Sequence, residues 1–267
     1  MSGFLILLPP AERKRPGGNA LAPSLFDLRA AGTFNYFAEL NPERRRLIEV
    51  LQEALAAGHA ADVLGLEGAA LDTAAAADMD VLDGPRMAAL ERYGPGVMYE
   101  AMNFSGLPTG AQRRLLEHVV ILSGLWGLLR ADDLIPDYRL SMDTTVPGLG
   151  KVSAYWRPRL SPVLNQAVEG RVVWNLLPGA HREAWDDAHT YEAMALVRFE
   201  ERQGEERRAL SHGVKPLRGA LVAHLVRDGA ERLDTIQSWR SPGGFRLDEA
   251  ATTHDEPTRT TTFTFVR

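Results

Sequence analysis

The 267-residue chain contains no cysteine. Without a thiol, the protein cannot form a disulfide bond, a thiolate zinc site, a cysteine-bound iron–sulfur cluster or a cysteine nucleophile. Lysine is scarce too, because only three of the 30 basic side chains are lysines: Lys14, Lys151 and Lys215. Lysine supplies a compact ammonium that can titrate, whereas the bulkier guanidinium stays protonated. We therefore expect the three lysines to mark places where this difference matters, with chance retention as the alternative.

Long hydrophobic runs are also missing. The apolar run at residues 1–10 is too short to span a bilayer, and no basic region precedes it. It predicts a buried first strand in a cytoplasmic protein with no membrane partner. The chain has no Walker loop, dinucleotide-binding glycine fingerprint, Gly-x-Ser-x-Gly elbow or His-Glu-x-x-His motif, so no standard motif identifies a reaction.

Charge is unevenly distributed along the chain. The formal net charge of −5 excludes a bulk polycation that coats nucleic acid, so any DNA binding requires a local basic patch. Basic residues gather in the middle of the sequence, between residues 113 and 159. This pattern permits a positive cleft on an acidic body, with ordinary surface salt pairing as the alternative.

Segments typical of strands and helices alternate throughout, which predicts a mixed α/β (α+β) fold with a central mixed sheet and surrounding helices. No internal repeat or low-complexity linker is visible, so we expect a single domain over residues 1–267. The apolar and alternating patterns predict strands at residues 4–8, 119–122, 171–176 and 260–266, and a hairpin at 191–201 and 206–212. Helical patterns begin at Asn41 and cover 71–78, 87–93, 109–118, 153–166 and 217–227, with a kink or split expected at Pro158 and Pro162.

A central segment resembles the signature of the YaaA peroxide-stress family. It consists of Leu122-Ser123-Gly124-Leu125-Trp126-Gly127-Leu128-Leu129-Arg130, then Asp133-Leu134-Ile135-Pro136, then Tyr138-Arg139-Leu140-Ser141-Met142. Further similar segments follow the family's order: the first strand with its Pro-Pro turn and Lys14, Gly150-Lys151 before Tyr155-Trp156, Val173-Trp174-Asn175-Leu176, Lys215-Pro216-Leu217-Arg218-Gly219, and Gly244-Phe245-Arg246-Leu247-Asp248-Glu249. One departure is Gly213-Val214, where the family often has an aromatic residue followed by Asn or Ala.

The resemblance implies a cytosolic bacterial protein linked to survival of hydrogen peroxide. It also implies a positive cleft and a helix-hairpin-helix-like element that contacts DNA. The best segment for that element is Ser123–Gly127 with Arg130, because the backbone N–H groups of a glycine hairpin can approach phosphates. Gly124 and Gly127 are three residues apart where the usual hairpin spaces its glycines by two, so a tight strand-to-helix turn with Trp126 in the core is the alternative.

A second set of residues is predicted to bind an anion. Loops that leave the carboxyl ends of central strands commonly hold ligands, so Lys14 after the first strand and Lys215 at a helix start can converge on one anion. Arg139 can clamp a phosphate or carboxylate, and aromatic side chains can stack on a base. The predicted binding residues are Lys14, Ser123, Gly124, Gly127, Arg130, Tyr138, Arg139, Lys151, Trp156, Asn175, Lys215 and Arg218. Each aromatic or amide side chain taken alone is equally suited to a structural role.

Metal binding has one candidate cluster, formed by His181, Asp186, Asp187 and His189. Its spacing matches no standard metal motif, so we expect neither a metal nor another cofactor. The sequence identifies no obligate protein partner.

The leading interpretation is a protein of the oxidative-stress response that binds DNA through phosphate contacts, independently of base sequence. The alternative is an enzyme that acts on a small anionic or nucleobase-like substrate in a pocket lined by lysine and arginine, with a lysine as base or nucleophile. A third possibility is a family member whose fold is retained but whose site has shifted, given the change beside Lys215. The partner is accordingly DNA or a phosphate-bearing small molecule, and an enclosed positive pocket would favour the latter.

Overall fold

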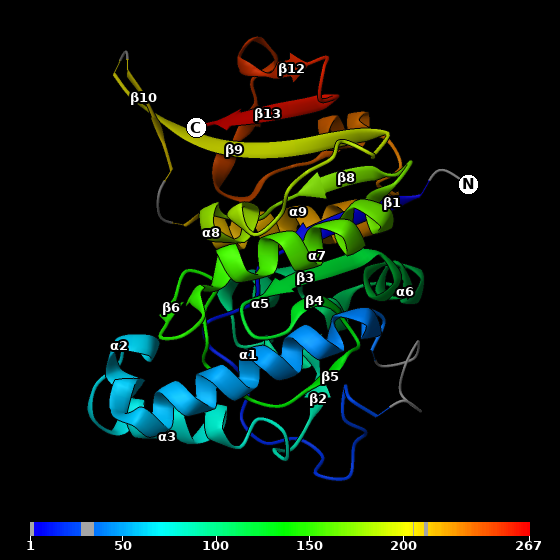
Figure 1. Cartoon of the computed structure of the whole chain (residues 1–267). Helices are drawn as coiled ribbons and strands as arrows, with labels where there is room; N and C mark the ends of the chain where they lie inside the picture. Colours follow the sequence, from blue (N-terminus) through cyan, green and yellow to red (C-terminus); the bar gives the residue numbers. More distant parts are fainter. Residues whose placement is uncertain (1–2, 28–34, 205, 211–212) are drawn as a thin grey trace.

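The computed structural model describes residues 3–27, 35–204, 206–210 and 213–267 (Figure 1). Its centre is a nine-stranded sheet in the order β11-β13-β9-β8-β1-β3-β4, with β10 added to β9 and β12 to β13. The strands are β1 (Phe4–Leu8), β3 (Val119–Ser123), β4 (Gly127–Arg130), β8 (Val172–Asn175), β9 (Ala193–Gln203), β10 (Glu206–Ala209), β11 (Arg246–Leu247), β12 (Thr253–Asp255) and β13 (Thr260–Val266). The mixed α/β fold predicted from the sequence is confirmed.

The middle of the sheet is parallel and its edges are antiparallel. Strands β13, β9, β8, β1 and β3 run parallel to their neighbours, whereas β4, β10, β11 and β12 pair antiparallel. In β1, Ile6 lies between Val119 of β3 and Trp174 of β8. All five side chains of β1 are buried, as expected for a central strand with both faces covered.

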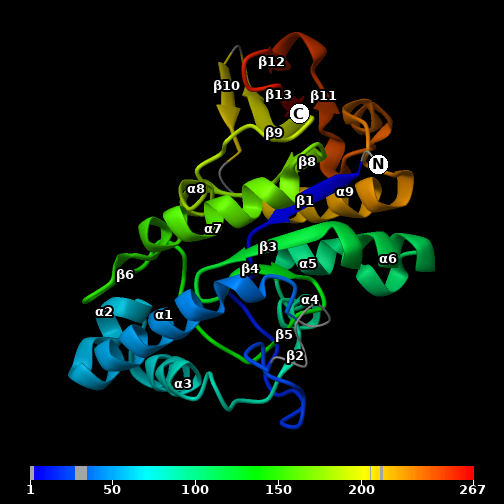
Figure 2. The same ribbon diagram turned by 45° about the vertical axis from the view of Figure 1, so that its right-hand side comes forward.

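Helices cover both faces of the parallel strands. Helix α7 (Val152–Val168) crosses in front of the sheet in Figure 1, and α9 (Val214–Asp228) lies behind it; Figure 2 shows β1 between the two. Helices α5 (Val97–Met102) and α6 (Thr109–His118) pack against α9. The short helix α8 (Gly179–Glu183) follows β8 and packs on α7.

A helical group lies beyond the β4 edge of the sheet, at the bottom of Figure 1. It contains α1 (Asn41–Ala54), a π-helical turn (Leu55–His59), α2 (Ala60–Leu64) and α3 (Gly68–Met79). The remaining short helix is α4 (Ala89–Arg92), and two small strand pairs are β2 (Met87–Ala88) with β5 (Leu134–Ile135) and β6 (Thr145–Val146) with β7 (Gly150–Lys151). There are 3₁₀ turns at Ala38–Leu40, Phe104–Gly106, Leu233–Ser238, Pro242–Gly244 and Glu249–Ala251. No helix in the described part of the chain has the length and apolar character needed to cross a membrane.

The predicted strands 4–8 and 260–266 and the predicted helix 109–118 begin and end where expected. Two local predictions were wrong. The segment 87–93 begins as a strand, because Met87 pairs with Ile135 of β5, and only Ala89–Arg92 is helical. Helix α7 is not split at Pro158 and Pro162, because burial of its inward face outweighs the cost of two prolines, about 3 kcal/mol each. Residues 211 and 212 of the predicted hairpin lie outside the described residues.

Candidate functional site

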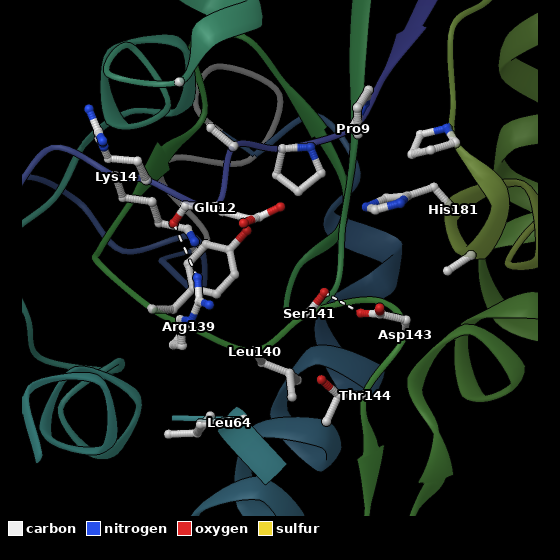
Figure 3. A pocket seen from close by; sticks show the side chains of 18 of the residues that line it. Pro9, Glu12, Lys14, Leu64, Arg139, Leu140, Ser141, Asp143, Thr144 and His181 are labelled. Carbon is white, nitrogen blue, oxygen red and sulfur yellow. Dashed lines mark hydrogen bonds between the residues drawn. The ribbon is translucent and has the colours of Figure 1, made fainter. Parts of the chain in front are cut away.

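A cavity of about 1000 Å³ lies where several chain segments meet beside the sheet (Figure 3). Its wall includes Pro9 to Lys14 after β1, and Pro178 with His181 after β8. Because β1 and β8 are parallel neighbours, these two loops leave the same edge of the sheet. The other wall segments are residues 62–65, 95–99 and 138–145, together with Lys215 and Arg218 of α9.

The cavity brings together five of the residues predicted from the sequence to bind an anion. They are Lys14, Tyr138, Arg139, Lys215 and Arg218. Four of these side chains are cationic, and they come from the first loop, the segment after β5 and the first turns of α9. The fold therefore gathers positive charge from distant parts of an acidic chain into one hollow. Their role in binding stays a prediction.

Lys14 is half-buried at one side of the cavity. Its Nζ lies 4.3 Å from the centroid of the Tyr138 ring. Within the described part of the chain, no hydrogen bond or ion pair engages this amine. Burial lowers the pKa of Lys14 to about 8; the carboxylate of Asp137 opposes this change, and the nearby Arg139 guanidinium adds to it. The result is an amine that loses its proton far more readily than an ordinary lysine.

Asp78 lies beneath Lys14 and is fully buried near the end of α3. Its Oδ1 accepts a hydrogen bond from the backbone N–H of Arg139 at 2.7 Å, whereas Oδ2 has no partner among the described residues. Burial raises the pKa of Asp78 to about 7, although this backbone bond and the charge of Lys14 both favour the carboxylate. Sequence reasoning missed this residue, since it belongs to an Ala- and Asp-rich helix with weak periodicity.

Tyr138 presents its ring to Lys14, but its hydroxyl is already engaged inside the protein. The hydroxyl lies 2.6 Å from that of Tyr93 and 2.8 Å from Oγ of Ser123. Burial raises the pKa of Tyr138 well above its usual range. Tyr138 therefore acts as a neutral wall under the Lys14 amine.

The other three cations of the cavity differ in how they are held. Lys215 is exposed and its Nζ lies 3.3 Å from Oε1 of Glu12, which is also exposed, so this ion pair is weak. Arg139 makes one long hydrogen bond, from Nη1 to the Glu12 carbonyl oxygen at 3.5 Å. Arg218 is largely buried, and burial lowers its pKa, as does the nearby Arg182. A ligand anion would compensate the charge of Arg218, which pairs with no carboxylate among the described residues.

His181 lies on the opposite side of the cavity from Lys14, with its ring directed inward (Figure 3). Both ring nitrogens are without a hydrogen-bond partner in the described residues. Burial lowers the pKa of His181 to about 4, with Asp143 opposing the change, so the imidazole is neutral at pH 7. Nearby, Ser141 Oγ donates a hydrogen bond to Asp143 Oδ1 at 2.6 Å. This side of the cavity offers neutral imidazole nitrogens, which can donate to or accept from a ligand.

The structure does not bring the four residues of the candidate His/Asp cluster to one point. His181 faces the cavity, Asp186 pairs with Arg157 at 2.8 Å, and Asp187 lies 3.2 Å from His189. The described residues contain no group of three or more histidine, aspartate or glutamate side chains able to hold a metal ion. The signal that could have identified His181 is its position just after Pro178-Gly179, in the loop that leaves the predicted strand 171–176.

The turn at Ser123–Gly127 lies in the core, and its assignment to a helix-hairpin-helix was wrong. It joins two antiparallel strands, β3 and β4, and Leu125 and Trp126 within it are buried. A Cβ on Gly124 would lie 2.6 Å from the Ser141 carbonyl carbon, and one on Gly127 would lie 2.9 Å from the Trp156 ring. The glycines therefore make room for protein neighbours, and no phosphate can reach the turn.

The remaining predicted residues also lie outside the cavity wall. Arg130 turns back to the Leu116 carbonyl oxygen, and Trp156 is fully buried with Nε1 donating to the Gly124 carbonyl oxygen at 2.7 Å. Asn175 ends β8 and accepts a hydrogen bond from the Leu177 N–H at 3.1 Å. Lys151 is exposed and pairs with Glu183 at 2.6 Å. The structural alternatives for Trp156 and Asn175 are the ones observed.

Comparison with known proteins gives consistent matches along the chain. A family model described as "Peroxide stress protein YaaA" matches residues 4–251. A UPF0246 protein of Streptomyces coelicolor is 33% identical, over 85% of this chain and 84% of the relative. A UPF0246 protein of Corynebacterium efficiens is 34% identical over 85% and 87%, and one of Corynebacterium glutamicum is 29% identical over 92% and 95%.

Proposed function

Since the chain belongs to the YaaA peroxide stress protein family, we propose that it serves the response to peroxide by binding a small phosphate-bearing molecule in the cavity. The observation that carries this proposal is the convergence of Lys14, Arg139, Lys215 and Arg218 on one hollow. Cations close together repel one another, so their collection at one place favours an anion between them. Arginine and lysine are the side chains that most often bind phosphate in proteins.

The size of the cavity favours a small molecule over a nucleic-acid duplex. At about 1000 Å³ it lies at the upper end of the range for small-molecule sites and is large enough for a nucleotide. The turn predicted to hold DNA phosphates, Ser123–Gly127, is buried beneath other segments. The turn is therefore inaccessible, whereas other residues predicted to bind an anion or DNA, such as Lys14 and Lys215, border a cavity that a ligand can enter.

The two sides of the cavity suit the two parts of such a ligand. Lys14 and Arg139 lie on one side, and His181 lies on the other with Ser141 and Asp143. Positive groups recognise a phosphate, whereas a neutral imidazole and a carboxylate recognise the donors and acceptors of a base or sugar. This division points to a ligand that carries both an anionic group and a polar ring, as a nucleotide does.

Titration calorimetry with nucleoside 5′-monophosphates, the corresponding nucleosides and a short DNA duplex tests the proposal. We expect at least one monophosphate to bind about tenfold or more tightly than its nucleoside, because each 1.4 kcal/mol of phosphate contact is worth a factor of ten. Lys215→Ala should weaken this binding by roughly tenfold. The urea midpoint should not change, because the Lys215 side chain is exposed and its ion pair with Glu12 is a surface pair.

Lys151→Ala is the matched control, since Lys151 is also an exposed lysine in a surface ion pair but lies outside the cavity wall. It should leave nucleotide affinity unchanged. Equal affinities of the Lys215→Ala variant and the wild-type protein would contradict the proposal. Duplex binding that is tighter than that of every nucleotide and falls steeply with salt would show instead that DNA is the ligand.

A further inference from the structure

We propose that Lys14 is a nucleophile of the cavity and attacks the carbonyl carbon of a phosphate-bearing aldehyde or ketone. This inference rests on the proposed function, because the neighbouring cations are what would hold the phosphate of such a substrate. It adds a reaction to the binding site and assigns the reacting atom, Nζ of Lys14. The experiment below separates failure of the nucleophile from failure of anion binding.

The position of the amine is the first argument. Nζ of Lys14 lies over the Tyr138 ring at 4.3 Å, in the wall of the cavity, and no described side chain or carbonyl accepts a hydrogen bond from it. A lysine held by a carboxylate would have to leave its partner before reacting. Lys14 has no carboxylate partner among the residues that the structure describes, and it borders the space where a substrate would sit.

The surroundings of the amine supply the second argument. Burial lowers the pKa of Lys14 to about 8 and the Arg139 guanidinium adds to this change, whereas the carboxylate of Asp137 opposes it. At pH 7.4 about a fifth of the amine is then unprotonated, compared with roughly one part in a thousand for a lysine at its usual pKa of 10.5. Desolvation next to another cation is an established way to activate a lysine as a nucleophile.

The reaction requires only the Lys14 amine and the substrate carbonyl. The nitrogen lone pair forms a bond to the carbonyl carbon, the π electrons move to oxygen, and one N–H proton passes to that oxygen to give a carbinolamine. The hydroxyl then leaves as water with the second N–H proton, and a carbon–nitrogen double bond forms. Water reverses both steps, so the adduct is transient unless it is reduced.

The chain carries its own controls, because the other two of its three lysines are exposed and paired with carboxylates. Lys215 lies in the same cavity wall and pairs with Glu12, and Lys151 lies outside it and pairs with Glu183. A reaction governed by exposure would favour these two. A reaction governed by the environment of the amine would favour Lys14.

Pyridoxal 5′-phosphate, a phosphate-bearing aldehyde, is the probe. The full-length protein is treated with it at pH 7.4, reduced with borohydride and mapped by peptide mass spectrometry. We expect labelling of Lys14 at least tenfold faster than labelling of Lys151 or Lys215. We also expect excess inorganic phosphate to slow labelling, and pyridoxal, which lacks the phosphate, to label Lys14 more slowly.

Two results would show that Lys14 is not a nucleophile: equal labelling of the three lysines, or no labelling of Lys14 while phosphate-bearing ligands still bind. Either result leaves the proposed binding function intact. Conversely, labelling of Lys14 that neither phosphate addition nor phosphate removal changes supports the nucleophile and contradicts anion binding. Lys14→Arg should abolish the fast labelling while keeping the positive charge. Because the site is mapped on the wild-type protein, the result does not depend on whether that variant folds.

Asp78→Asn gives a second readout, the pH at which labelling is half-maximal. Asn keeps an oxygen that can accept the Arg139 N–H, but removes a negative charge that favours the ammonium form of Lys14. We expect the midpoint to move to lower pH in this variant. A midpoint that does not move, or moves to higher pH, would show that the charge of Asp78 does not favour the ammonium form of Lys14.

Discussion

The loop after β1 and the turn between β3 and β4 carry similar sequence signals, since both combine glycines with basic residues in a strand-ending segment. The structure puts them in opposite environments. Lys14 of the loop borders the cavity, whereas Gly124 and Gly127 of the turn are enclosed by Ser141, Met142 and the Trp156 ring. Glycine permits close approach of any group, and the neighbouring residues decide whether that group is a ligand or the protein itself.

For the turn, the deciding neighbours are Trp126 and Arg44. Trp126 is buried, and the fully buried Arg44 of α1 donates from Nε to the Trp126 carbonyl oxygen at 2.9 Å and from Nη2 to the Leu128 carbonyl oxygen at 2.7 Å. Arg44 thus satisfies carbonyl oxygens of the turn, and the Trp126 N–H, a donor that a phosphate could have used, donates instead to Ser123 Oγ at 3.1 Å. Around the cavity, Lys14, His181 and Asp78 each have a polar atom with no partner among the described residues.

Replacing Arg44 should destabilise the β3–β4 turn more than any other substitution considered for this comparison. Arg44→Met leaves two buried carbonyl oxygens of the β3–β4 turn without donors, and we expect a loss of about 3–5 kcal/mol in the free energy of unfolding. Urea denaturation followed by circular dichroism measures it. Arg46→Met on the same helix is the control, because Arg46 is exposed and makes only a long pair with Glu49, so a change within about 0.5 kcal/mol is expected. Equal losses in the two variants would show that Arg44 does not support the turn.

A methyl group added at Gly124 should cause the next largest loss of stability. A Cβ at Gly124 would lie 2.6 Å from the Ser141 carbonyl carbon and 2.8 Å from the Met142 nitrogen, so Gly124→Ala should cost about 2–3 kcal/mol. It should also weaken ligand binding, because Ser141 lies in the cavity wall. Gly110→Ala in α6, where the nearest atom is 3.8 Å from the added Cβ, should be neutral or slightly stabilising in the same urea titration. A Gly124→Ala protein as stable as wild type would mean that the turn has room for a ligand after all.

The smallest effect concerns the cavity and depends on pH. The pKa of His181 is lowered from 6.5 to about 4 in the folded protein, so below pH 6.5 the unfolded chain binds more protons at this residue. Stability should therefore fall as the pH drops from 6.5 towards 4. His181→Gln should make this fall in the free energy of unfolding smaller by roughly 1–2 kcal/mol. The value is modest because the ring is only partly buried.

Thermal unfolding of wild type and His181→Gln at a series of pH values between 7 and 4.5 measures this difference. His254→Gln, which changes an exposed ring on β12, serves as the control and should follow the wild-type curve more closely. Parallel curves for wild type and His181→Gln would show that the ring is not held neutral in the cavity.

Much of the fold was predictable because its strongest signals are local. The five apolar residues of β1, the alternation of threonine and phenylalanine in β13 and the amphipathic pattern of α6 each specify one element. The start of β2 was not predictable in this way, because Met87 is extended only through its pairing with Ile135, far along the chain. Family resemblance and the scarcity of lysine pointed to Lys14 and Lys215. His181 had only its place in the loop after a predicted strand, and Asp78 carried no local signal of its own.

The amino-acid sequence alone determined the absence of thiol chemistry, the alternation of strands and helices, the family and the few lysines available to react. The tertiary structure decided which polar groups are satisfied and which are left facing a cavity. The physical reason is that hydrogen-bond satisfaction and desolvation depend on atoms brought together from distant segments, such as Arg139 above Asp78 and Arg44 behind the β3–β4 turn. Residue type determines which reactions and hydrogen bonds a side chain can make. Burial and the neighbouring atoms determine which of these it can still make in the folded protein.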